Sequence, residues 1–295
     1  MPRLIANGIE IEVESFGRSD DPAVLLIMGL GMQMLAWPDA LCHSLAKSGY
    51  RVIRFDNRDV GLSQRMSDSA RVNLPLAAMR YLMHLPVAAP YTLETMAEDA
   101  VGVLDALGIE RAHLVGASLG GMVAQSAAAR HPDRVLSLAS IMSSSGDRRL
   151  PTAQLKILRL MLSRPKHGSD LEAWIRHYVR VFQAIGSPGF PTPPELLETR
   201  VRSFVERSHY PAGTLRQILA IIASGDRSAQ LGRITAATLV LHGKADPLVP
   251  VAHGVDCARK IPGARLELVA GMGHDLAPGL LPMLQAQLLE HFART

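Results

Sequence analysis

Residues 112–121 read Ala-His-Leu-Val-Gly-Ala-Ser-Leu-Gly-Gly, and they carry the most specific indication of the fold. A short apolar run that suits a buried strand leads into Gly116, Ser118 and Gly120, and an alanine-rich helical pattern follows. A serine at so sharp a strand-to-helix turn is held in a strained conformation, and the glycines let neighbouring backbone approach. A serine here would also suit a simple helix N-cap, but the strand before it and the helix after it favour a nucleophile elbow. We therefore interpret Ser118 as a nucleophile, with Gly116 and Gly120 as the elbow glycines.

Short apolar runs alternate with helical patterns on both sides of this turn. Such runs are typical of parallel strands that are buried on both faces of a sheet. The expected strands are residues 23–28, 50–55, 112–115, 135–142, 237–241 and 266–269, and the expected helices are residues 38–47, 93–107, 119–130, 251–260 and 282–291. Residues 9–15 alternate apolar and charged side chains, which predicts a half-exposed strand at the edge of the sheet. The alternation of strand and helix predicts a mostly parallel, doubly wound α/β sheet.

One long segment interrupts this alternation. Residues 146–233 show helical periodicity, and the four expected helices are residues 153–162, 171–182, 194–207 and 214–223. We expect residues 1–145 and 234–295 to form the α/β core and residues 146–233 to form a helical lid over a pocket. We expect some of the apolar lid residues to line this pocket above Ser118, and the alternative is that they only anchor the lid to the sheet; they include Leu160, Met161, Trp174, Val181 and Phe182. A second apolar insert at residues 74–85 is placed to flank the same entrance.

The general base is sought among the histidines far downstream of the elbow, because the partners of an elbow serine follow it in the order acid, then histidine. Four histidines lie more than a hundred residues beyond Ser118, namely His242, His253, His274 and His291. His274 lies in the glycine-rich loop Gly-Met-Gly-His-Asp after the last expected strand, where its side chain can turn toward the elbow. The other three fall within an expected strand end or helices. His274 is therefore the predicted base.

The acid that orients this histidine has two candidates. Asp246 follows the strand at residues 237–241, and a carboxylate there can accept the Nδ1 proton of His274 and leave Nε2 free for the serine proton. An aspartate before proline is also a common turn residue. Asp147, just after the preceding strand, is the alternative position. We predict Asp246, and we expect Asp275 to point elsewhere.

The oxyanion hole needs two backbone N–H groups. One is expected from the residue after the nucleophile, Leu119, and the other from the loop that follows residues 23–28. That loop reads Met-Gly-Leu-Gly-Met at positions 28–32, and its glycines allow the backbone to approach a tetrahedral oxyanion. A glycine turn without function would look the same, but its position relative to the elbow favours the catalytic interpretation. The amides of Leu30 and Leu119 are the predicted donors.

Composition and charge exclude several other classes. The 295 residues are 48% hydrophobic and 20% charged, with two cysteines, which cannot build a disulfide framework. The chain shows no signal-peptide pattern and no apolar run long enough to cross a bilayer, so we expect a cytoplasmic protein without a membrane span. Residues 146–233 hold 14 Lys and Arg against 7 Asp and Glu, but the charge is scattered and no nucleic-acid motif accompanies it. We expect no nucleic-acid partner, and the sequence leaves the oligomeric state open.

The motifs together resemble the α/β-hydrolase superfamily across nearly the whole chain. The set comprises residues 28–31, 37–38, 54–63, 116–121, 141–144 and 273–276, and its finer pattern resembles the aclacinomycin methylesterase-like and related carboxylesterase branch, which also includes serine-dependent macrolide esterases. The resemblance implies the triad Ser118, Asp246 and His274, with Leu30 and Leu119 as the oxyanion amides. We interpret residues 56–63 as structural, pinning loops near the site, because they lack His or Cys partners at metal-ligand spacing.

These observations predict two-step hydrolysis of a small-molecule carboxylic ester, apolar or bulky, through an acyl-enzyme, without a metal or cofactor. A serine at the elbow disfavours haloalkane dehalogenase and epoxide hydrolase chemistry, which in this fold call for an aspartate. The same triad acting on a macrolide lactone, an amide or iminopeptidase substrate, or in perhydrolysis is the nearest alternative. A non-catalytic ligand-binding homologue is an alternative of another class, and it is disfavoured by an intact triad.

Overall fold

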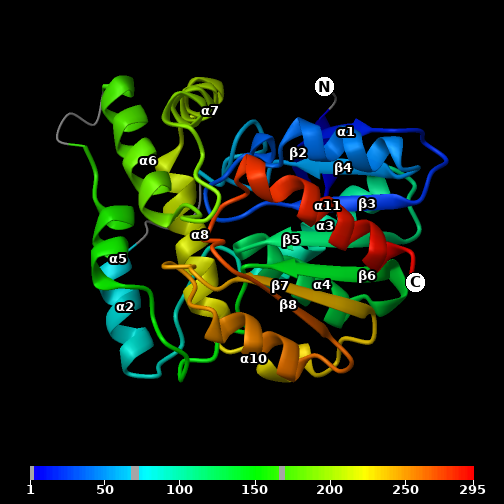
Figure 1. Ribbon diagram of the computed structural model, residues 1–295. Coiled ribbons are helices and arrows are strands. Elements are labelled where there is room, and N and C mark those ends of the chain that lie inside the picture. The colour runs from blue at the N-terminus through cyan, green and yellow to red at the C-terminus, as the bar shows by residue number, and fades with distance from the viewer. Residues whose placement is uncertain (1–2, 68–72, 166–169) are drawn as a thin grey trace.

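A single sheet forms the centre of the molecule. The structure is a computed structural model that describes residues 3–67, 73–165 and 170–295, and within these residues eight strands pair in the order β1-β2-β4-β3-β5-β6-β7-β8 (Figure 1). The strands are β1 (Arg3–Ala6), β2 (Ile9–Phe16), β3 (Ala23–Ile27), β4 (Arg51–Phe55), β5 (Ala112–Ala117), β6 (Val135–Ile141), β7 (Ala237–Gly243) and β8 (Arg265–Val269). Strands β3 to β8 pair in parallel, whereas β1 and β2 are antiparallel to their neighbours. The predicted mostly parallel sheet is confirmed.

The prediction of an edge strand at residues 9–15 is wrong. The edge is β1, which the sequence patterns did not reveal, and β2 lies between β1 and β4. Glu12 of β2 is consequently buried, and its backbone N–H donates to Ser63 Oγ. A four-residue strand with only two strongly apolar side chains, Leu4 and Ile5, is too short to show a period.

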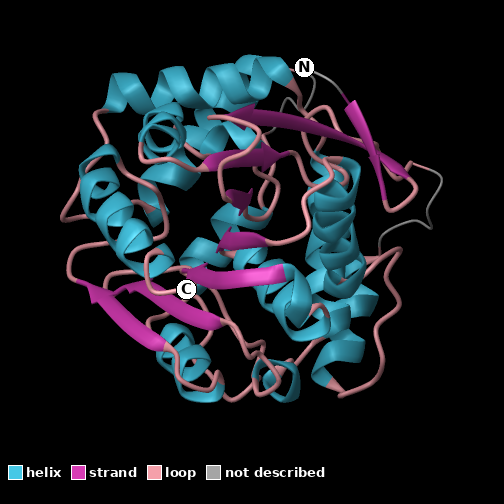
Figure 2. Cartoon of the chain, turned by 90° about the vertical axis from the view of Figure 1, so that its right-hand side faces the viewer, coloured by secondary structure: helices cyan, strands magenta, loops and turns pink. Residues whose placement is uncertain are grey.

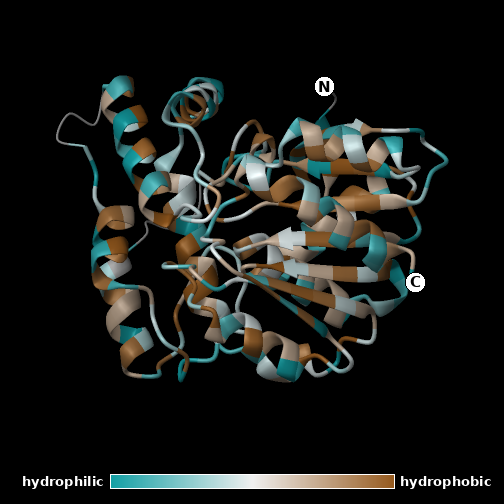
Figure 3. Cartoon of the chain, in the orientation of Figure 1, coloured by the Kyte–Doolittle hydropathy of each residue, from teal (hydrophilic) through white to brown (hydrophobic). Residues whose placement is uncertain are grey.

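Helices cover both faces of the sheet (Figure 2). They are α1 (Asp39–Lys47), α3 (Leu93–Ala106), α4 (Leu119–Arg130), α10 (Ala252–Lys260) and α11 (Leu281–Phe292). Residues of β3 alternate between two apolar cores: Leu25 and Ile27 face one that includes α3 and α4, and Val24 and Leu26 face one that includes α1 and α11. Figure 3 shows the apolar residues gathered along the strands and the inner helix faces. Burial on both faces explains why these strands read as continuous apolar runs.

Within the described part of the chain, four helices between β6 and β7 form a layer at one end of the sheet (Figure 1). They are α5 (Leu155–Leu162), α6 (Leu171–Ile185), α7 (Pro194–Arg207) and α8 (Pro211–Ser224), and α2 (Leu74–Leu82) lies in the same layer. The short α9 (Ser228–Leu231) also precedes β7 but packs against α4 and α10. The first four match the expected helices, whereas α9 was not expected. The division of the chain into a core and a lid at residues 146–233 stays a prediction, and we call these residues the helical segment.

The chain before α5 and the chain after α8 meet where the helical segment joins the core. A Cβ added at Gly146 would lie 2.1 Å from the carbonyl oxygen of Gly225, so these two chain segments are in direct contact. The backbone N–H of Arg227 donates to Ser145 O at 2.9 Å, and its buried guanidinium donates to Ser144 O at 2.5 Å. The segment therefore leaves and re-enters the core at neighbouring points.

Candidate active site

Ser118 occupies the turn between β5 and α4. Its backbone has φ +55° and ψ −119°, a region that non-glycine residues rarely adopt. A Cβ added at Gly116 would lie 2.2 Å from Gly120 O, and one added at Gly120 would lie 2.0 Å from Ile27 O. Only glycine fits at these two positions. The turn is tied to β6 by the Ser118 N–H, which donates to Ile141 O at 2.9 Å.

The structure brings the three predicted catalytic side chains together. Nε2 of His274 lies 2.9 Å from Ser118 Oγ, and its Nδ1 lies 2.6 Å from Asp246 Oδ2. The other carboxylate oxygen of Asp246 accepts the backbone N–H groups of Leu248 and Val249 at 2.9 and 2.8 Å. Because Asp246 accepts the Nδ1 proton, Nε2 can accept the serine proton. Ser118 is partly exposed, whereas His274 and Asp246 are buried.

The loop that carries His274 is held by the helical segment. The backbone N–H of His274 donates to Ile185 O, at the end of α6, at 2.7 Å. Ser187 Oγ accepts the Gly273 N–H at 2.8 Å and donates to Asp275, so Asp275 points away from the triad as expected. Burial raises the pKa of the Asp275 carboxyl. Nothing in the sequence around Ser187 indicated this contact, since its partners are more than 80 residues away.

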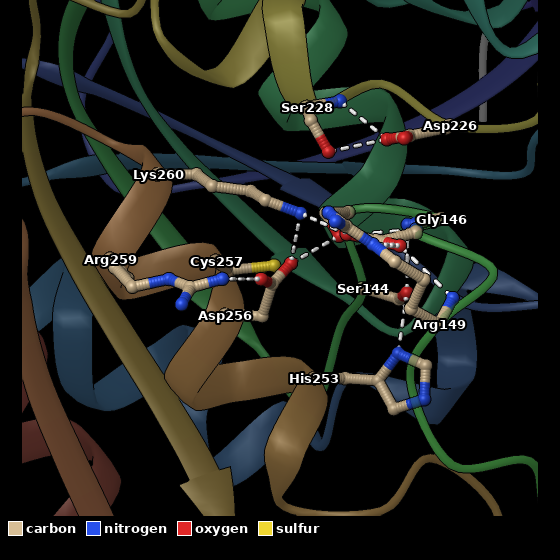
Figure 4. Close-up of polar contacts among 12 residues, drawn as sticks. Ser144, Gly146, Arg149, Asp226, Ser228, His253, Asp256, Cys257, Arg259 and Lys260 are labelled. Atoms are coloured by element: carbon tan, nitrogen blue, oxygen red, sulfur yellow. Dashed lines mark hydrogen bonds and ion pairs between the residues drawn. The ribbon is translucent and has the colours of Figure 1, made fainter.

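Asp147, the alternative acid, belongs to a separate ionic cluster, whose members Arg149, Asp256 and Lys260 are labelled in Figure 4. Its carboxylate pairs with Arg149 at 2.7 Å and with Lys260 at 2.8 Å, and Lys260 also pairs with Asp256 at 2.7 Å. The hydrogen bonds from Arg149 and Lys260 hold the pKa of the Asp147 carboxyl below its usual range. Through these ion pairs Asp147 anchors the chain that follows β6 to α10. The hydrogen-bond partner of His274 is Asp246.

The three other downstream histidines each make a structural contact. Nε2 of His242 donates to Val249 O at 2.8 Å and lies 3.6 Å from Asp246 Oδ2. This buried ring therefore packs against the loop that carries Asp246. Burial lowers its pKa. His253 contacts Ser144 Oγ at 2.8 Å (Figure 4), and its Nε2 donates to Pro151 O at 2.8 Å. His291 donates to Leu138 O at 3.0 Å.

The loop after β3 lies against Ser118. A Cβ added at Gly29 would lie 3.2 Å from Ser118 Cβ and 3.7 Å from its Oγ, which places the Leu30 peptide beside the elbow. The start of the loop is fixed by Asn57, whose Nδ2 donates to Met28 O at 2.8 Å. Of the two predicted amide donors, Leu119 directly follows Ser118 in the chain and Leu30 directly follows Gly29, which lies close to Ser118 in space. Their catalytic role stays a prediction.

Residues 56–63 connect this loop to the helical segment, in agreement with their structural interpretation. Asp56 accepts the Met34 N–H at 2.8 Å and pairs with Arg207, the last residue of α7, at 2.7 Å. Asp59 accepts two hydrogen bonds from Arg216 of α8, at 2.7 and 2.8 Å, and one from the hydroxyl of Tyr91. These carboxylates thus join core and helical segment beside the candidate oxyanion hole.

A small cavity lies between this loop and helices α6 to α8. Its lining is largely aromatic and polar: Gly31, Gln33, Asp59, Val60, Gly61, Tyr178, Phe204, Ser208, His209, Tyr210 and Thr214. None of the five apolar residues named as candidates for a pocket lining is among these residues, although the Trp174 ring lies 4.6 Å from the ring of His209, which lines the cavity. Among the described residues no helix is both long and apolar enough to cross a membrane.

Comparison with known proteins places this geometry in a family. The sequence profile of the alpha/beta hydrolase fold family matches residues 22–277. Two rhodomycin D methylesterases from Streptomyces species are 29% and 27% identical to the chain over 314 aligned positions, covering 99% of it and 98% of each relative. A putative carbamate hydrolase from Variovorax paradoxus is 29% identical over 96% of both chains.

Solved structures agree on the fold. An enol-lactonase from Burkholderia xenovorans superposes with a TM-score of 0.75 at 21% identity, covering 99% of this chain and 100% of that one. A meta-cleavage product hydrolase from Pseudomonas fluorescens gives 0.76 at 19% identity, covering 100% and 98%. The methylesterase relatives are those that the sequence motifs indicated, and the profile spans most of the chain. The protein belongs to the alpha/beta hydrolase fold family.

Proposed function

We propose that this protein is a serine-dependent carboxylic ester hydrolase that works through an acyl-enzyme. The observation that carries the proposal is the continuous hydrogen-bonded chain from Ser118 through His274 to Asp246, with distances of 2.9 and 2.6 Å. Its order and tautomer suit nucleophilic attack by a serine. The names of the methylesterase relatives support ester hydrolysis as the reaction.

In the first step, Ser118 Oγ attacks the ester carbonyl carbon while His274 Nε2 takes its proton. The carbonyl oxygen becomes an oxyanion, which the N–H groups of Leu30 and Leu119 stabilise, and Asp246 stabilises the imidazolium that forms. The tetrahedral intermediate collapses, the C–O bond to the alcohol breaks, and His274 returns its proton to the leaving oxygen. Water activated by the same imidazole then attacks the acyl-enzyme and releases the acid.

The substrate that we infer is an apolar or bulky ester, with a methyl ester of a bulky acid as the first compound to test. The cavity beside Gly31 holds only about 20 Å³, too little to enclose a bulky group, so its aromatic lining residues Tyr178 and Phe204 support contact with an apolar surface and not a preformed pocket. The name of the rhodomycin D methylesterases supports a methyl ester as the bond. The helical segment, which supplies most of this lining, is then the lid of the site.

A fluorophosphonate probe and p-nitrophenyl acetate test the proposal directly. We expect the probe to label Ser118 alone, and Ser118→Ala to remove nearly all turnover while the protein stays folded. Ser144→Ala is the matched control, because Ser144 contacts His253 and lies outside the triad. A panel of methyl esters, a macrocyclic lactone and a prolyl amide then identifies the preferred bond. Labelling of a different serine, together with an active Ser118→Ala variant, would refute the assignment.

A further inference from the structure

The loop next to Ser118 is held from the helical segment as well as from the core. Gln217 lies on α8, and its side chain is completely buried. Its Oε1 accepts the backbone N–H of Gly31 at 2.8 Å, and its Nε2 donates to the carbonyl oxygen of Arg58 at 3.0 Å. A backbone N–H can only donate and a carbonyl can only accept, so the two partners together fix which way the amide points.

Two further contacts keep α8 in place against this loop. A Cβ added at Gly31, which has φ +65°, would lie 2.7 Å from Thr214 Oγ1, one turn before Gln217. The neighbouring Arg216 pairs with both carboxylate oxygens of buried Asp59. α8 is thus anchored at residues 58–59 and packs against Gly31. Gln217 is the side chain that links the position of α8 to the backbone of the loop, through its hydrogen bond with the Gly31 N–H.

Gly31 is the residue after Leu30, so its N–H belongs to the next peptide group along the chain. Peptide groups are planar, and only φ and ψ of Leu30 separate the two N–H vectors. The preceding Gly29 lies close to Ser118, and its carbonyl oxygen accepts the Met32 N–H at 3.2 Å. Fixing the Gly31 N–H from α8 therefore restricts the direction in which the Leu30 N–H points.

We propose that Gln217 is a positioning residue for the oxyanion hole, acting through Gly31 on the Leu30 amide. The inference rests on the proposed ester hydrolysis and extends it: the helical segment contributes to the rate of the chemical step as well as to the choice of substrate. A donor that is correctly oriented before the reaction stabilises the developing oxyanion without reorganisation. Loss of the Gln217 contact lets this donor reorient and weakens stabilisation of the transition state.

The test is Gln217→Met, which keeps the length of the side chain and removes both hydrogen bonds. We expect kcat on p-nitrophenyl acetate to fall about 10- to 100-fold, less than when an oxyanion donor is deleted outright, with KM unchanged. Gln230→Met is the matched control: it removes the contacts of Gln230 with Glu94 and Ser126, away from the loop, and should leave kcat unchanged. The affinity of a boronic acid that forms a tetrahedral adduct on Ser118 should fall by the same factor as kcat/KM.

Gln217→Glu provides a second test, which also applies if the Gln217→Met variant does not fold. A protonated carboxyl has one acceptor and one donor, as the amide has, whereas an ionised carboxylate repels the Arg58 carbonyl. We expect the activity of this variant, relative to the wild type, to be highest at the acidic end of the working range and to fall as the introduced carboxyl ionises. Its pH–rate profile should therefore contain one ionisation that the wild-type profile lacks.

A folded Gln217→Met variant with wild-type kcat, or with a loss confined to KM, would overturn the positioning role. So would a Gln217→Glu variant with the wild-type pH profile. These outcomes differ from failure of the proposed function itself, in which the wild-type protein would neither turn over esters nor react with the fluorophosphonate at Ser118.

Discussion

Asp246 holds Nδ1 of His274 at 2.6 Å, and the same carboxylate accepts two backbone N–H groups from the loop that follows it. The orientation of the Asp246 carboxylate is therefore set by hydrogen bonds within its own turn, independently of His274. His242 lies behind it at 3.6 Å and donates its own proton to Val249 O. In this arrangement the orientation of the imidazole depends on a rigid loop at the end of β7.

Exchange of the two candidate acids for asparagine separates their roles. We expect Asp246→Asn to lower kcat by on the order of 10⁴-fold, the loss known for the same change in the trypsin-type triad, because asparagine favours the wrong tautomer of the histidine. Asp147→Asn should leave kcat close to the wild-type value and lower the thermal midpoint instead, since it breaks the contacts with Arg149 and Lys260. Steady-state kinetics and thermal unfolding of both variants decide the matter. A larger kinetic loss at Asp147 would contradict the assignment.

The approach of Gly29 to the nucleophile makes a second prediction. In Gly29→Ala the new methyl group would lie 3.2 Å from Ser118 Cβ, so the loop or the serine must shift by a few tenths of an ångström. We expect the protein to fold and kcat to fall roughly 10-fold, since a 1 Å misplacement can cost about 100-fold. Gly232→Ala is the control, because the nearest atom to its added Cβ is 3.7 Å away. Equal kcat in the two variants would place the loop farther from the reacting atoms.

Buried histidines predict that acid destabilises the fold. Burial, with a further contribution from His291, lowers the pKa of His113 to about 4. Its neutral form is thus favoured in the folded state, so its stabilisation is present above pH 6.5 and is lost as the pH falls from 6.5 toward 4. Such a group removes about 1.4 kcal/mol per pH unit in this window.

The check is urea unfolding of the wild type and of His113→Gln between pH 7.5 and 5. His113 contacts Ser137 at 2.8 Å and stacks on Phe292, so the variant is expected to be less stable at pH 7.5. Its stability should nevertheless fall less steeply with acid than that of the wild type. Parallel pH dependences for both proteins would show that His113 does not titrate as argued.

The sequence could predict the candidate site residues where the signal lies in neighbouring residues. Ser118 lies in a turn whose glycines and flanking elements are all within ten residues, and the order along the chain restricted the histidine to a few positions. Asp246 required one further step, since a loop at the end of a parallel strand is where the acid must lie. The structure brings all three side chains together at hydrogen-bonding distance.

Contacts between distant segments escaped prediction for a physical reason. Gln217 reaches Gly31 across 186 positions, and in sequence it is an ordinary polar residue on an amphipathic helix. Ser187 and the strand β1 were missed for similar reasons: their partners are set by tertiary packing, and neither carries a periodic pattern. The apolar residues expected in a pocket are the opposite case, in which a role was predicted that the cavity lining does not show. Hydrophobicity alone does not distinguish packing within the helical layer from contact with a ligand.

The contact of Gly146 with Gly225 has an evolutionary consequence. Because the helical segment starts and ends at one point of the core, its length can change without moving β6 or β7, and long insertions of this kind cost little in loop closure. The core is thus open to exchange of the whole insertion, by recombination or by grafting in the laboratory. If Gln217 orients the loop as proposed, a graft without an equivalent side chain opposite Gly31 would keep Ser118 and lose part of the rate, so a grafted helical segment has to include α8 or an equivalent of it.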